Sequence, residues 1–361
     1  MTKILTAGDH FVLNSLLQEA LVRHAPTAVE VSELTLPWPV EPFHPVGEVD
    51  EASGTEDELI EALQGVQVCL TQMAPLTERV LHECPDLRLF AITRGGPVNA
   101  NIPAATQHGV AVTSAPGRNA TATAEHTVAL LLAAVRQVPQ RNSELLAGEW
   151  RSDYYRYQDV GPEIRGATVG LVGYGAIGSR VAGILNGFGA RILVFDPFLQ
   201  PGALPESAHQ AGSLEELLAA ADIVTLHARL TAATTGLIGA RELAAMRPGS
   251  ILINAARGAL VDYDALCDAL EAGHLFAAGL DVYPAEPLPA ASRLRTIRSV
   301  VMTPHLAGAS KPTAHKAADI GASEVGRFLR GEALQHCSNP RRLPPGCPSP
   351  PPARHALDPN R

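Results

Sequence analysis

Residues 169–178, with the sequence Val-Gly-Leu-Val-Gly-Tyr-Gly-Ala-Ile-Gly, decide the fold of this 361-residue chain. An apolar run leads into a Gly-x-Gly-x-x-Gly turn formed by Gly173, Gly175 and Gly178. The first glycine permits a tight turn from strand to helix, the second lets the backbone approach a pyrophosphate, and the third lets the helix pack closely on the sheet. The N–H groups at the start of the following helix, expected over residues 176–186, would bind the phosphates. The stretch therefore predicts a dinucleotide-binding unit.

An aspartate follows the next predicted strand at the distance that such a unit requires. Asp196 comes directly after the strand-like run 191–195 and 18 residues after Gly178. Its carboxylate would lie at the carboxyl end of a strand, where it can accept hydrogen bonds from the ribose hydroxyls of the adenosine. A 2′-phosphate at this place would meet a like charge. The sequence therefore predicts NAD as the cofactor rather than NADP.

The composition is that of a soluble globular protein with room for two domains, because 46% of the residues are apolar and 18% are charged. The net charge of −9 comes without a basic cluster, so we expect no nucleic-acid partner and no membrane partner. Five cysteines form no Cys-x-x-Cys pair, and the N-terminus leads straight into a strand-like run. These features predict a cytoplasmic protein without a metal site.

Strand and helix patterns alternate on both sides of the glycine motif and predict an α/β protein with two doubly wound parallel sheets of the Rossmann or flavodoxin type. The expected strands are residues 3–7, 29–34, 66–71, 87–93 and 110–114 before the motif, and 223–227, 250–255, 276–282 and 300–303 after it. A long helix over 119–136 should connect the domains and bend or end at Pro139. Residues 37–54 are interpreted as a loop, and the proline-rich residues 344–361 as a disordered tail.

Three residues of different chemistry follow three of the later strands. Arg257 comes after the strand over 250–255, Glu286 after that over 276–282, and His305 after that over 300–303. Because ligands of open α/β sheets bind outside the carboxyl ends of the strands, we expect these side chains to gather at the nicotinamide end of the cofactor.

These three residue types suit hydride transfer at an alcohol carbon. The hydroxyl proton needs a base, and the reverse reduction needs the same group as an acid, which a histidine such as His305 provides near neutral pH. Glu286 would stabilise the imidazolium and raise its pKa. Arg257 offers a planar fork for a substrate carboxylate.

The motifs around these residues resemble the signatures of the D-isomer-specific 2-hydroxyacid dehydrogenases, in particular the group similar to phosphoglycerate dehydrogenase. The matching stretches are Asn254-Ala255-Ala256-Arg257-Gly258, Gly279-Leu280-Asp281-Val282 with Glu286-Pro287, and Thr303-Pro304-His305-Leu306-Ala307-Gly308. The resemblance implies that the cofactor domain is inserted into the substrate domain. We expect the substrate domain over 1–117 and 308–343, and the NAD-binding domain over 118–307.

The resemblance also implies roles for individual residues. His305 would be the proton donor, Glu286 its partner and Arg257 the substrate arginine, while Asp281 would contact the nicotinamide carboxamide. The groove for NAD would be lined by Ala176, Ile177, His227, Ala228 and Ala255. The family's usual dimer predicts a homodimer through the NAD-binding domain, with residues 119–136 at the interface. Trp150 is interpreted as a packing anchor, with a substrate contact across subunits as the alternative.

The loop over residues 93–102 bears on the substrate. We expect Arg94, Gly95, Gly96 and Asn99 to bind it, with the backbone N–H groups near the two glycines receiving a carboxylate. The second half of the loop departs from the family pattern, and Asn99 in it indicates extra hydroxyls on the substrate, as in a sugar acid. Arg229 stands where the family usually has a proline and leaves some use of NADP open.

The sequence thus predicts an NAD-dependent oxidoreductase that acts on the CH-OH group of a small anionic 2-hydroxy acid. The substrate's side chain stays open, because a few pocket contacts decide it. The alternative is an NADH-sensing, partner-binding protein of the C-terminal-binding corepressor type, without significant turnover. Formate dehydrogenase is a poorer match, because it needs no acid/base pair and carries a glutamine where Glu286 stands.

Overall fold

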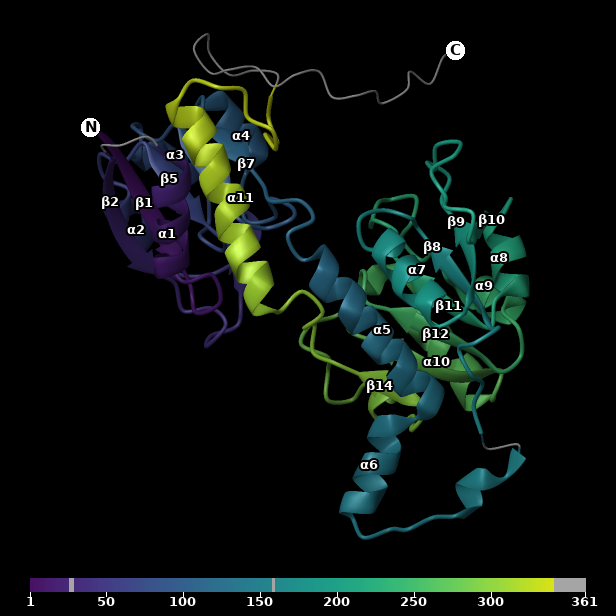
Figure 1. The fold of residues 1–361 in the computed structure, drawn as a ribbon. Coiled ribbons are helices and arrows are strands. Elements are labelled where there is room, and N and C mark those ends of the chain that lie inside the picture. Colours follow the sequence, from purple (N-terminus) through teal and green to yellow (C-terminus); the bar gives the residue numbers. More distant parts are fainter. Residues whose placement is uncertain (26–28, 158–159, 341–361) are drawn as a thin grey trace. The chain divides into compact units, whose positions relative to one another are not determined.

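Two units divide the chain in the computed structural model, which describes residues 1–25, 29–157 and 160–340. Unit 1 comprises Met1–Asn119 and the described residues from Ser310 onward, and unit 2 comprises Ala120–Ala309. Both boundaries lie two residues beyond those expected from the sequence. The expected tail, 344–361, lies outside the described residues. Unit 1 is thus built from both ends of the chain, and Figure 1 shows the C-terminal yellow helix lying among the purple N-terminal elements.

Unit 1 contains a parallel sheet of five strands in the order β2-β1-β5-β6-β7. Their bounds are β1 Thr2–Gly8, β2 Val29–Thr35, β5 Val68–Thr71, β6 Leu89–Ile92 and β7 Ala111–Thr113. One face is covered by α1 (Asn14–His24) and α11 (Lys311–Leu329), which share an apolar cluster with Ile4, Val68 and Leu89. The other face is covered by α2 (Glu56–Ala62), α3 (Glu78–Glu83) and α4 (Ile102–Gln107). Strands β5, β6 and β7 are buried on both faces, which explains their continuous apolar runs, whereas the edge strand β2 is mostly exposed.

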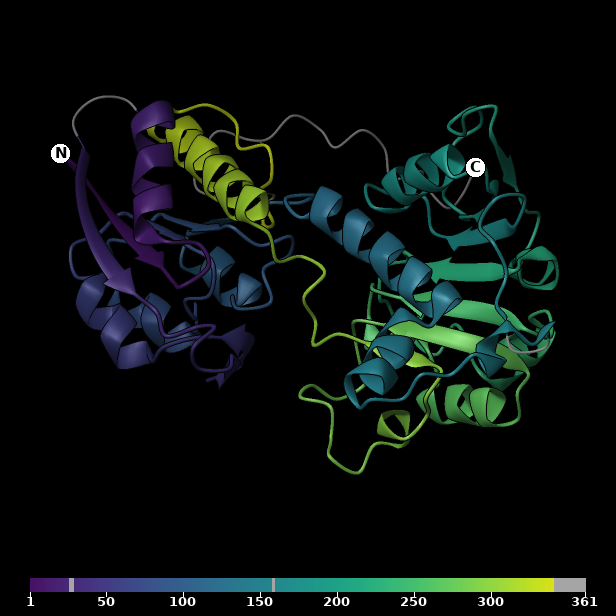
Figure 2. The same ribbon diagram turned by 60° about the horizontal axis from the view of Figure 1, so that its bottom comes forward.

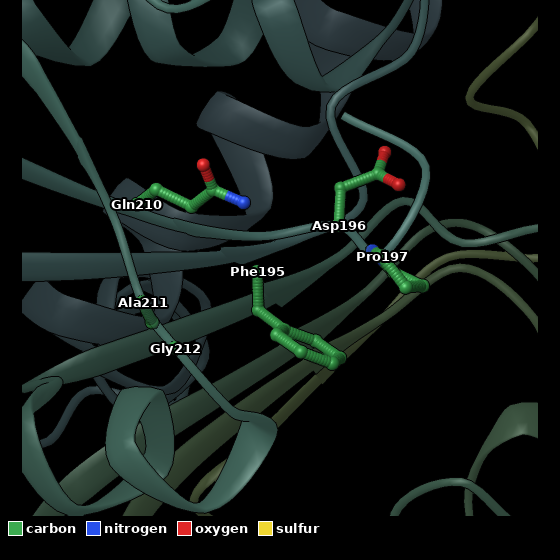
Figure 3. Close-up of a pocket in the computed structure, with 6 residues that line it drawn as sticks. All are labelled: Phe195, Asp196, Pro197, Gln210, Ala211 and Gly212. Carbon is green, nitrogen blue, oxygen red and sulfur yellow. The ribbon is translucent and has the colours of Figure 1, made fainter. Parts of the chain in front are cut away.

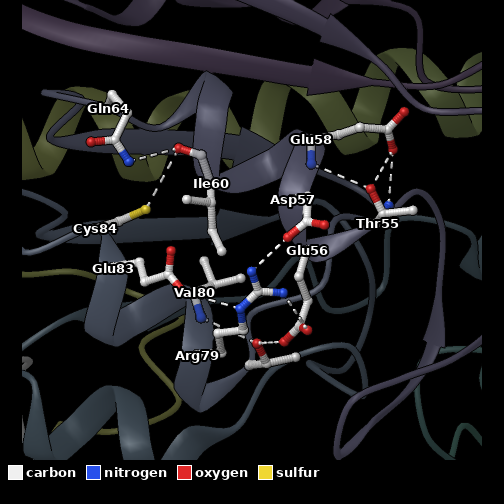
Figure 4. Close-up of polar contacts among 11 residues, drawn as sticks. Thr55, Glu56, Asp57, Glu58, Ile60, Gln64, Arg79, Val80, Glu83 and Cys84 are labelled. Atoms are coloured by element: carbon white, nitrogen blue, oxygen red, sulfur yellow. Dashed lines mark hydrogen bonds and ion pairs between the residues drawn. The ribbon is translucent and has the colours of Figure 1, made fainter.

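The segment interpreted as a loop, residues 37–54, contains a short antiparallel hairpin, so that interpretation is wrong in part. Strands β3 (His44–Val46) and β4 (Val49–Ala52) pair with each other and with no other strand of the described chain. After it, α2 begins at a capping box in which Thr55 and Glu58 satisfy each other's backbone N–H groups. Arg79 of α3 then contacts Asp57 of α2 at 2.6 Å (Figure 4).

Unit 2 contains a parallel sheet of seven strands in the order β10-β9-β8-β11-β12-β13-β14. Their bounds are β8 Thr168–Val172, β9 Arg191–Phe195, β10 Ala208–Gln210, β11 Ile223–Leu226, β12 Ser250–Asn254, β13 Leu275–Leu280 and β14 Val300–Met302. The helices are α5 Ala120–Arg136, α6 Val138–Leu146, α7 Gly178–Gly187, α8 Leu214–Ala220, α9 Ala240–Ala245 and α10 Tyr263–Glu271, with single 3₁₀ turns η1 Asp153–Tyr155, η3 Gly258–Leu260 and η4 Arg293–Arg295.

Helices cover both faces of this sheet. Residues of α5 and α7 share one apolar cluster with Val169, Leu171 and Ile253, and residues of α8, α9 and α10 share a second with Val224 and Leu252. Figure 2 shows α5 running across one face of the green strands. The strand order reverses between β8 and β11, and ligands of such sheets bind outside the carboxyl ends at that reversal.

Pro139 begins a helix rather than ending one. The long helix α5 stops at Arg136, Gln137 adopts a left-handed backbone with φ of 54°, and α6 starts at Val138 with the proline in its first turn. A proline fits there because the N–H groups of the first turn have no partner within the helix. In the part of the chain that the structure describes, no helix has both the length and the apolar character that crossing a membrane needs.

Candidate active site

The glycine turn after β8 has the geometry that its sequence predicts. Gly173 has φ of 100°, and a Cβ there would lie 2.8 Å from the carbonyl carbon of His227. A Cβ at Gly178 would lie 2.3 Å from the oxygen of Gly173, so the start of α7 is pressed against the turn. A Cβ at Gly175 would meet nothing within 4 Å. The turn is therefore tight at its first and third glycines and open at the second, where a pyrophosphate would approach.

Asp196 is hydrogen-bonded to this turn. Its Oδ2 accepts the N–H of Tyr174 at 2.8 Å, and its Oδ1 accepts the N–H of Phe198 at 2.9 Å. With its neighbours Phe195 and Pro197 and with residues 210–212 it lines a hollow of about 340 Å³ (Figure 3). Each carboxylate oxygen keeps a further lone pair, so Asp196 has acceptors left for ribose hydroxyls.

The other residues expected along the cofactor groove surround the same strand ends. Ala176 and Ile177 lie between the second and third glycines, and Ala255 follows β12 directly. His227 follows β11, and its N–H donates to the carbonyl of Val172 at the end of β8 (2.7 Å). Burial lowers the pKa of His227 to about 4, so its ring is neutral at pH 7. The next residue, Ala228, lies beside Gly173.

His305 and Glu286 form the closest acid/base pair of this region. Nδ1 of the histidine lies 2.6 Å from Oε2 of the glutamate, whose Oε1 accepts the N–H of Tyr283 at 2.9 Å. The hydrogen bond to Glu286 raises the pKa of His305, although burial and the charge of Arg257 act against it. Burial would raise the pKa of Glu286, but its hydrogen bonds to His305 and Tyr283 lower it. The His305 side chain is 43% exposed, so its ring remains accessible.

Asp281 holds the segment that carries His305. It is fully buried, and its carboxylate accepts the N–H groups of Leu306 and Ala307, both at 2.8 Å, and the hydroxyl of Thr303 at 2.5 Å. These bonds and one from His126 lower the pKa of Asp281, although burial alone would raise it. The carboxylate is fully buried, and its expected contact with a nicotinamide carboxamide stays a prediction.

His126 is part of this arrangement and was missed by the sequence reasoning. Its Nε2 lies 2.9 Å from the hydroxyl oxygen of Thr303 and 3.4 Å from Oδ1 of Asp281. It comes from α5, far from both partners in the sequence, and a histidine inside an apolar helix pattern gives no local signal of such a contact. The hydroxyl of Tyr283 also donates to the carbonyl of Thr303, at 2.9 Å.

Arg257 lies in the loop after β12, next to the loop that carries Glu286. The two loops meet so closely that a Cβ at Gly258 would lie 2.0 Å from the oxygen of Tyr283. Arg257 is exposed, and its Nη1 donates to the carbonyl of Ala256 at 2.7 Å. Within the described chain no carboxylate forms an ion pair with it, so the guanidinium has donors free for an anionic ligand.

The loop after β6 in unit 1 carries the remaining expected residues. A Cβ at Gly95 or Gly96 would meet nothing within 4 Å, so the backbone there is open. Arg94 donates to the Glu51 carbonyl at 3.0 Å and forms an ion pair with the carboxylate of the same residue.

Asn99 is placed differently from what we expected. It is fully buried, and its amide donates to the carbonyls of Ala74 (2.8 Å) and Gln72 (3.4 Å). Its side chain fixes the loop to the end of β5 and is not available to substrate hydroxyls in this structure.

Known proteins resemble both units. The family model "D-isomer specific 2-hydroxyacid dehydrogenase, NAD binding domain" matches residues 128–307. A D-3-phosphoglycerate dehydrogenase of Mycobacterium bovis is 39% identical over 284 residues, which are 78% of this chain and 53% of that protein. A glyoxylate reductase of Korarchaeum cryptofilum is 35% identical over 82% of this chain and 91% of its own length.

The fold is shared over almost the whole described chain. The crystal structure of the TT0316 protein from Thermus thermophilus matches with a TM-score of 0.77 and 32% identity, covering 93% of this chain and all of that one. The chain spans about half the length of the mycobacterial relatives. Its motifs, its two parallel sheets and these matches show that the chain belongs to the D-isomer specific 2-hydroxyacid dehydrogenases and carries their NAD-binding domain.

Proposed function

We propose that this chain is an NAD-dependent D-2-hydroxyacid dehydrogenase, similar to phosphoglycerate dehydrogenase, that interconverts a small anionic 2-oxo acid and its 2-hydroxy acid. The observation that carries the proposal is the 2.6 Å contact between His305 and Glu286 in the unit that holds the glycine turn. NAD(H), when bound, would give or take the hydride. Gly173, Gly175, Gly178 and Asp196 fit that cofactor, because the turn is open where the phosphates would lie and the aspartate has acceptors for the ribose.

His305 would move the proton. In the reduction its protonated ring donates a proton to the oxo oxygen of the substrate, and in the oxidation its neutral ring takes the proton from the hydroxyl. Glu286 holds Nδ1, so Nε2 is the ring atom left to face the substrate. The negative charge of Glu286 stabilises the imidazolium, which keeps the histidine protonated at a higher pH than an isolated ring.

Each unit offers donors for an anion, Arg257 in unit 2 and the open loop after β6 in unit 1. Arg257 has no carboxylate partner in the described chain, and its fork matches a substrate carboxylate with two parallel hydrogen bonds. The N–H groups of Gly95 and Gly96 donate to no described residue, so they can donate hydrogen bonds to carboxylate oxygens. Arg94 remains a proposed substrate-binding residue because it directly precedes these glycines, although Glu51 already neutralises its charge.

A homodimer through unit 2 is the assembly that we propose. The segment from α6 through η1 exposes several large apolar side chains, and Figure 1 shows α6 and the teal segment after it extending away from the sheet of unit 2. Leu146 is 80% exposed and Trp150 is 85% exposed, which rules out a packing role for this tryptophan inside its own chain. Contiguous exposed apolar side chains of this kind mark interaction sites. Light scattering should give twice the chain mass, and Leu146→Asp with Trp150→Ala should shift it toward the monomer.

A reducing compartment, the cytoplasm, suits the cysteines. Cys69, Cys84 and Cys267 are buried free thiols. Burial raises the pKa of the Cys69 and Cys84 thiols, which makes them unreactive at neutral pH. Fractionation of cells that produce the full chain would test this location.

Loss of NADH absorbance in the presence of 2-oxo acids tests the enzymatic function. The screen should include glyoxylate, hydroxypyruvate, phosphohydroxypyruvate and four- to six-carbon sugar 2-oxo acids. His305→Ala should lower kcat/KM by about 100- to 10,000-fold, with the affinity for NADH unchanged. His209→Ala is the matched control, because His209 is exposed on β10. Binding of NADH without turnover of any 2-oxo acid would refute the proposal and favour an NADH-sensing, partner-binding protein.

A further inference from the structure

Unit 1 contains an arginine that the proposed function does not use. Arg118 lies in the turn after β7, where its N–H donates to the carbonyl of Ala115 and the N–H of Ala115 donates to the carbonyl of Arg94 at 2.6 Å. The turn is thus fixed to the loop that follows β6. Asp9 and Gln72 follow β1 and β5 directly. Because β1, β5, β6 and β7 are neighbours in one parallel sheet, these residues all belong to its carboxyl edge.

The guanidinium of Arg118 is incompletely partnered. It is partly buried, and its Nη1 donates to Oε1 of the buried Gln72 at 2.9 Å. A guanidinium carries five N–H donors, and within the described residues no carboxylate forms an ion pair with this one. Arg94 differs, because Glu51 binds it through both a carbonyl and a carboxylate. Arg118 therefore holds a positive charge with donors to spare.

Asp9, the acidic group that attracts Arg118, forms no ion pair with it among the described residues. Asp9 is 1% exposed, and its Oδ1 accepts the N–H groups of Phe11 (2.8 Å) and Val12 (2.7 Å), while its buried Oδ2 has no partner in the described chain. Burial raises the pKa of Asp9 to about 6. Burial and then repulsion from Arg94 lower the pKa of Arg118 to about 10, although Asp9 attracts it. Arg118 and most of Asp9 are therefore charged at neutral pH, and Asp9 attracts the guanidinium without occupying its donors, which remain available to an oxyanion.

We infer that Arg118 binds a second anionic group of the substrate, a carboxylate or phosphoryl group in addition to the carboxylate next to the oxo carbon. The identity of the ligand as a substrate rests on the proposed function. The N–H groups of Gly95 and Gly96, in the same unit, provide donors for the first carboxylate. Arg118 adds a planar fork that matches either kind of oxyanion, and its fixed turn and Gln72 hold that fork in place.

Calorimetric titration of the full chain with two unreactive dianions, malonate and phosphate, measures this site without any turnover. Arg118→Gln should weaken binding of one or both by about 10- to 100-fold, the usual effect of removing a charge-assisted hydrogen bond. Arg118→Lys keeps the charge, so its affinity for the two probes should lie between those of the wild type and Arg118→Gln. Arg23→Gln is the matched control, because Arg23 is an exposed arginine of the same unit that pairs with Asp319 on α11. Its affinity for both probes should equal that of the wild type.

Steady-state kinetics with paired substrates then identify which group Arg118 recognises. Phosphohydroxypyruvate is compared with hydroxypyruvate, and oxaloacetate with pyruvate. Arg118→Gln should lower kcat/KM for the preferred dianion by about 10- to 100-fold and change it little for the matching monoanion. The pair that responds distinguishes a phosphoryl group from a carboxylate.

Several results would overturn the inference. One is an equal loss of kcat/KM in Arg118→Gln for both members of each substrate pair. Another is an unchanged affinity of Arg118→Gln for malonate and phosphate. A Tm several degrees lower in this variant, with unchanged anion binding, would show a structural role instead. A wild-type chain that turns over no 2-oxo acid but binds the probes through Arg118 would refute the proposed function and leave the anion site in place.

Discussion

Glu286 and His305 follow two adjacent parallel strands, β13 and β14, and their side chains meet at 2.6 Å from Oε2 to Nδ1. Since the hydrogen bond to Glu286 is the main cause of the raised pKa of His305, the pH dependence of the reaction should depend on that carboxylate.

Glu286→Gln should move the pH profile of the reduction toward acid. The reduction needs protonated His305. The kcat/KM of the reduction is therefore highest below the pKa of His305 and falls as the pH rises through it. Replacing the carboxylate by an amide removes the charge that raises this pKa, so the loss should begin at lower pH. The kcat/KM of the oxidation, which needs the neutral ring, should fall less. A profile of the variant that overlays the wild-type profile would place the proton transfer on another residue.

Asp281→Asn should destabilise unit 2 by about 2–4 kcal/mol in urea unfolding, because an amide cannot accept from Leu306, Ala307 and Thr303 together. Because its pKa is lowered from 3.8 in the folded state, Asp281 stabilises the fold above that value and loses this contribution as the pH falls through the folded pKa. The variant should lack this acid-dependent loss. Asp264→Asn, at an exposed position on α10, should change the unfolding free energy by less than about 0.5 kcal/mol. Equal stability of the two variants would contradict the positioning role of Asp281.

Two glycines of α7 should respond in opposite ways to alanine. Gly178→Ala places a Cβ 2.3 Å from the oxygen of Gly173, so it should cost about 2–3 kcal/mol of stability and weaken NADH binding. Gly183→Ala meets nothing within 4 Å and should stabilise the exposed helix position by about 0.5–1 kcal/mol, with unchanged NADH affinity. Urea unfolding and fluorescence titration with NADH measure both effects. Equal affinities in the two variants would show that the tight turn is not needed for the cofactor.

NADH should be used more efficiently than NADPH because of the carboxylate of Asp196, which would repel a 2′-phosphate. Asp196→Asn keeps the shape of the side chain and removes the charge, so the ratio of kcat/KM for NADH to that for NADPH should fall by about tenfold or more, which corresponds to about 1.4 kcal/mol. If the wild type used NADPH as well as NADH, the exposed Arg229 would become the candidate phosphate ligand.

The sequence predicts those parts of the structure that depend on local patterns. The strands of both sheets other than β10, the glycine turn and the proximity of Glu286 to His305 follow from strand patterns, from the motif and from the rule that adjacent parallel strands end at one edge. The sequence reasoning did not name the helices α2 and α4, the strand β10 or the hairpin β3-β4, which begins within a proline-rich segment. A period of 3.6 residues is hard to recognise over fewer than two turns.

Burial and contacts across the sequence account for the remaining differences. Asp281 and Asn99 match family positions or loop positions that invite a ligand, yet both are fully buried and bound to backbone groups. His126 meets Thr303 across 177 residues of sequence. No local pattern encodes these contacts, because they depend on how α5 and the loops pack on the finished sheet.

The discontinuous construction of unit 1 sets an order of folding. Its sheet needs α11, and the side chain of Asn339 accepts the N–H of Val112 at 3.0 Å and donates to the carbonyl of Val110 at 2.9 Å. On the ribosome, the first 119 residues therefore emerge long before the helix that covers them is made. Unit 2 is continuous in sequence and can complete its own core meanwhile. Until synthesis passes residue 339, the N-terminal strands thus have only α1 on the face that α1 and α11 later cover together, which leaves part of its apolar surface in contact with water.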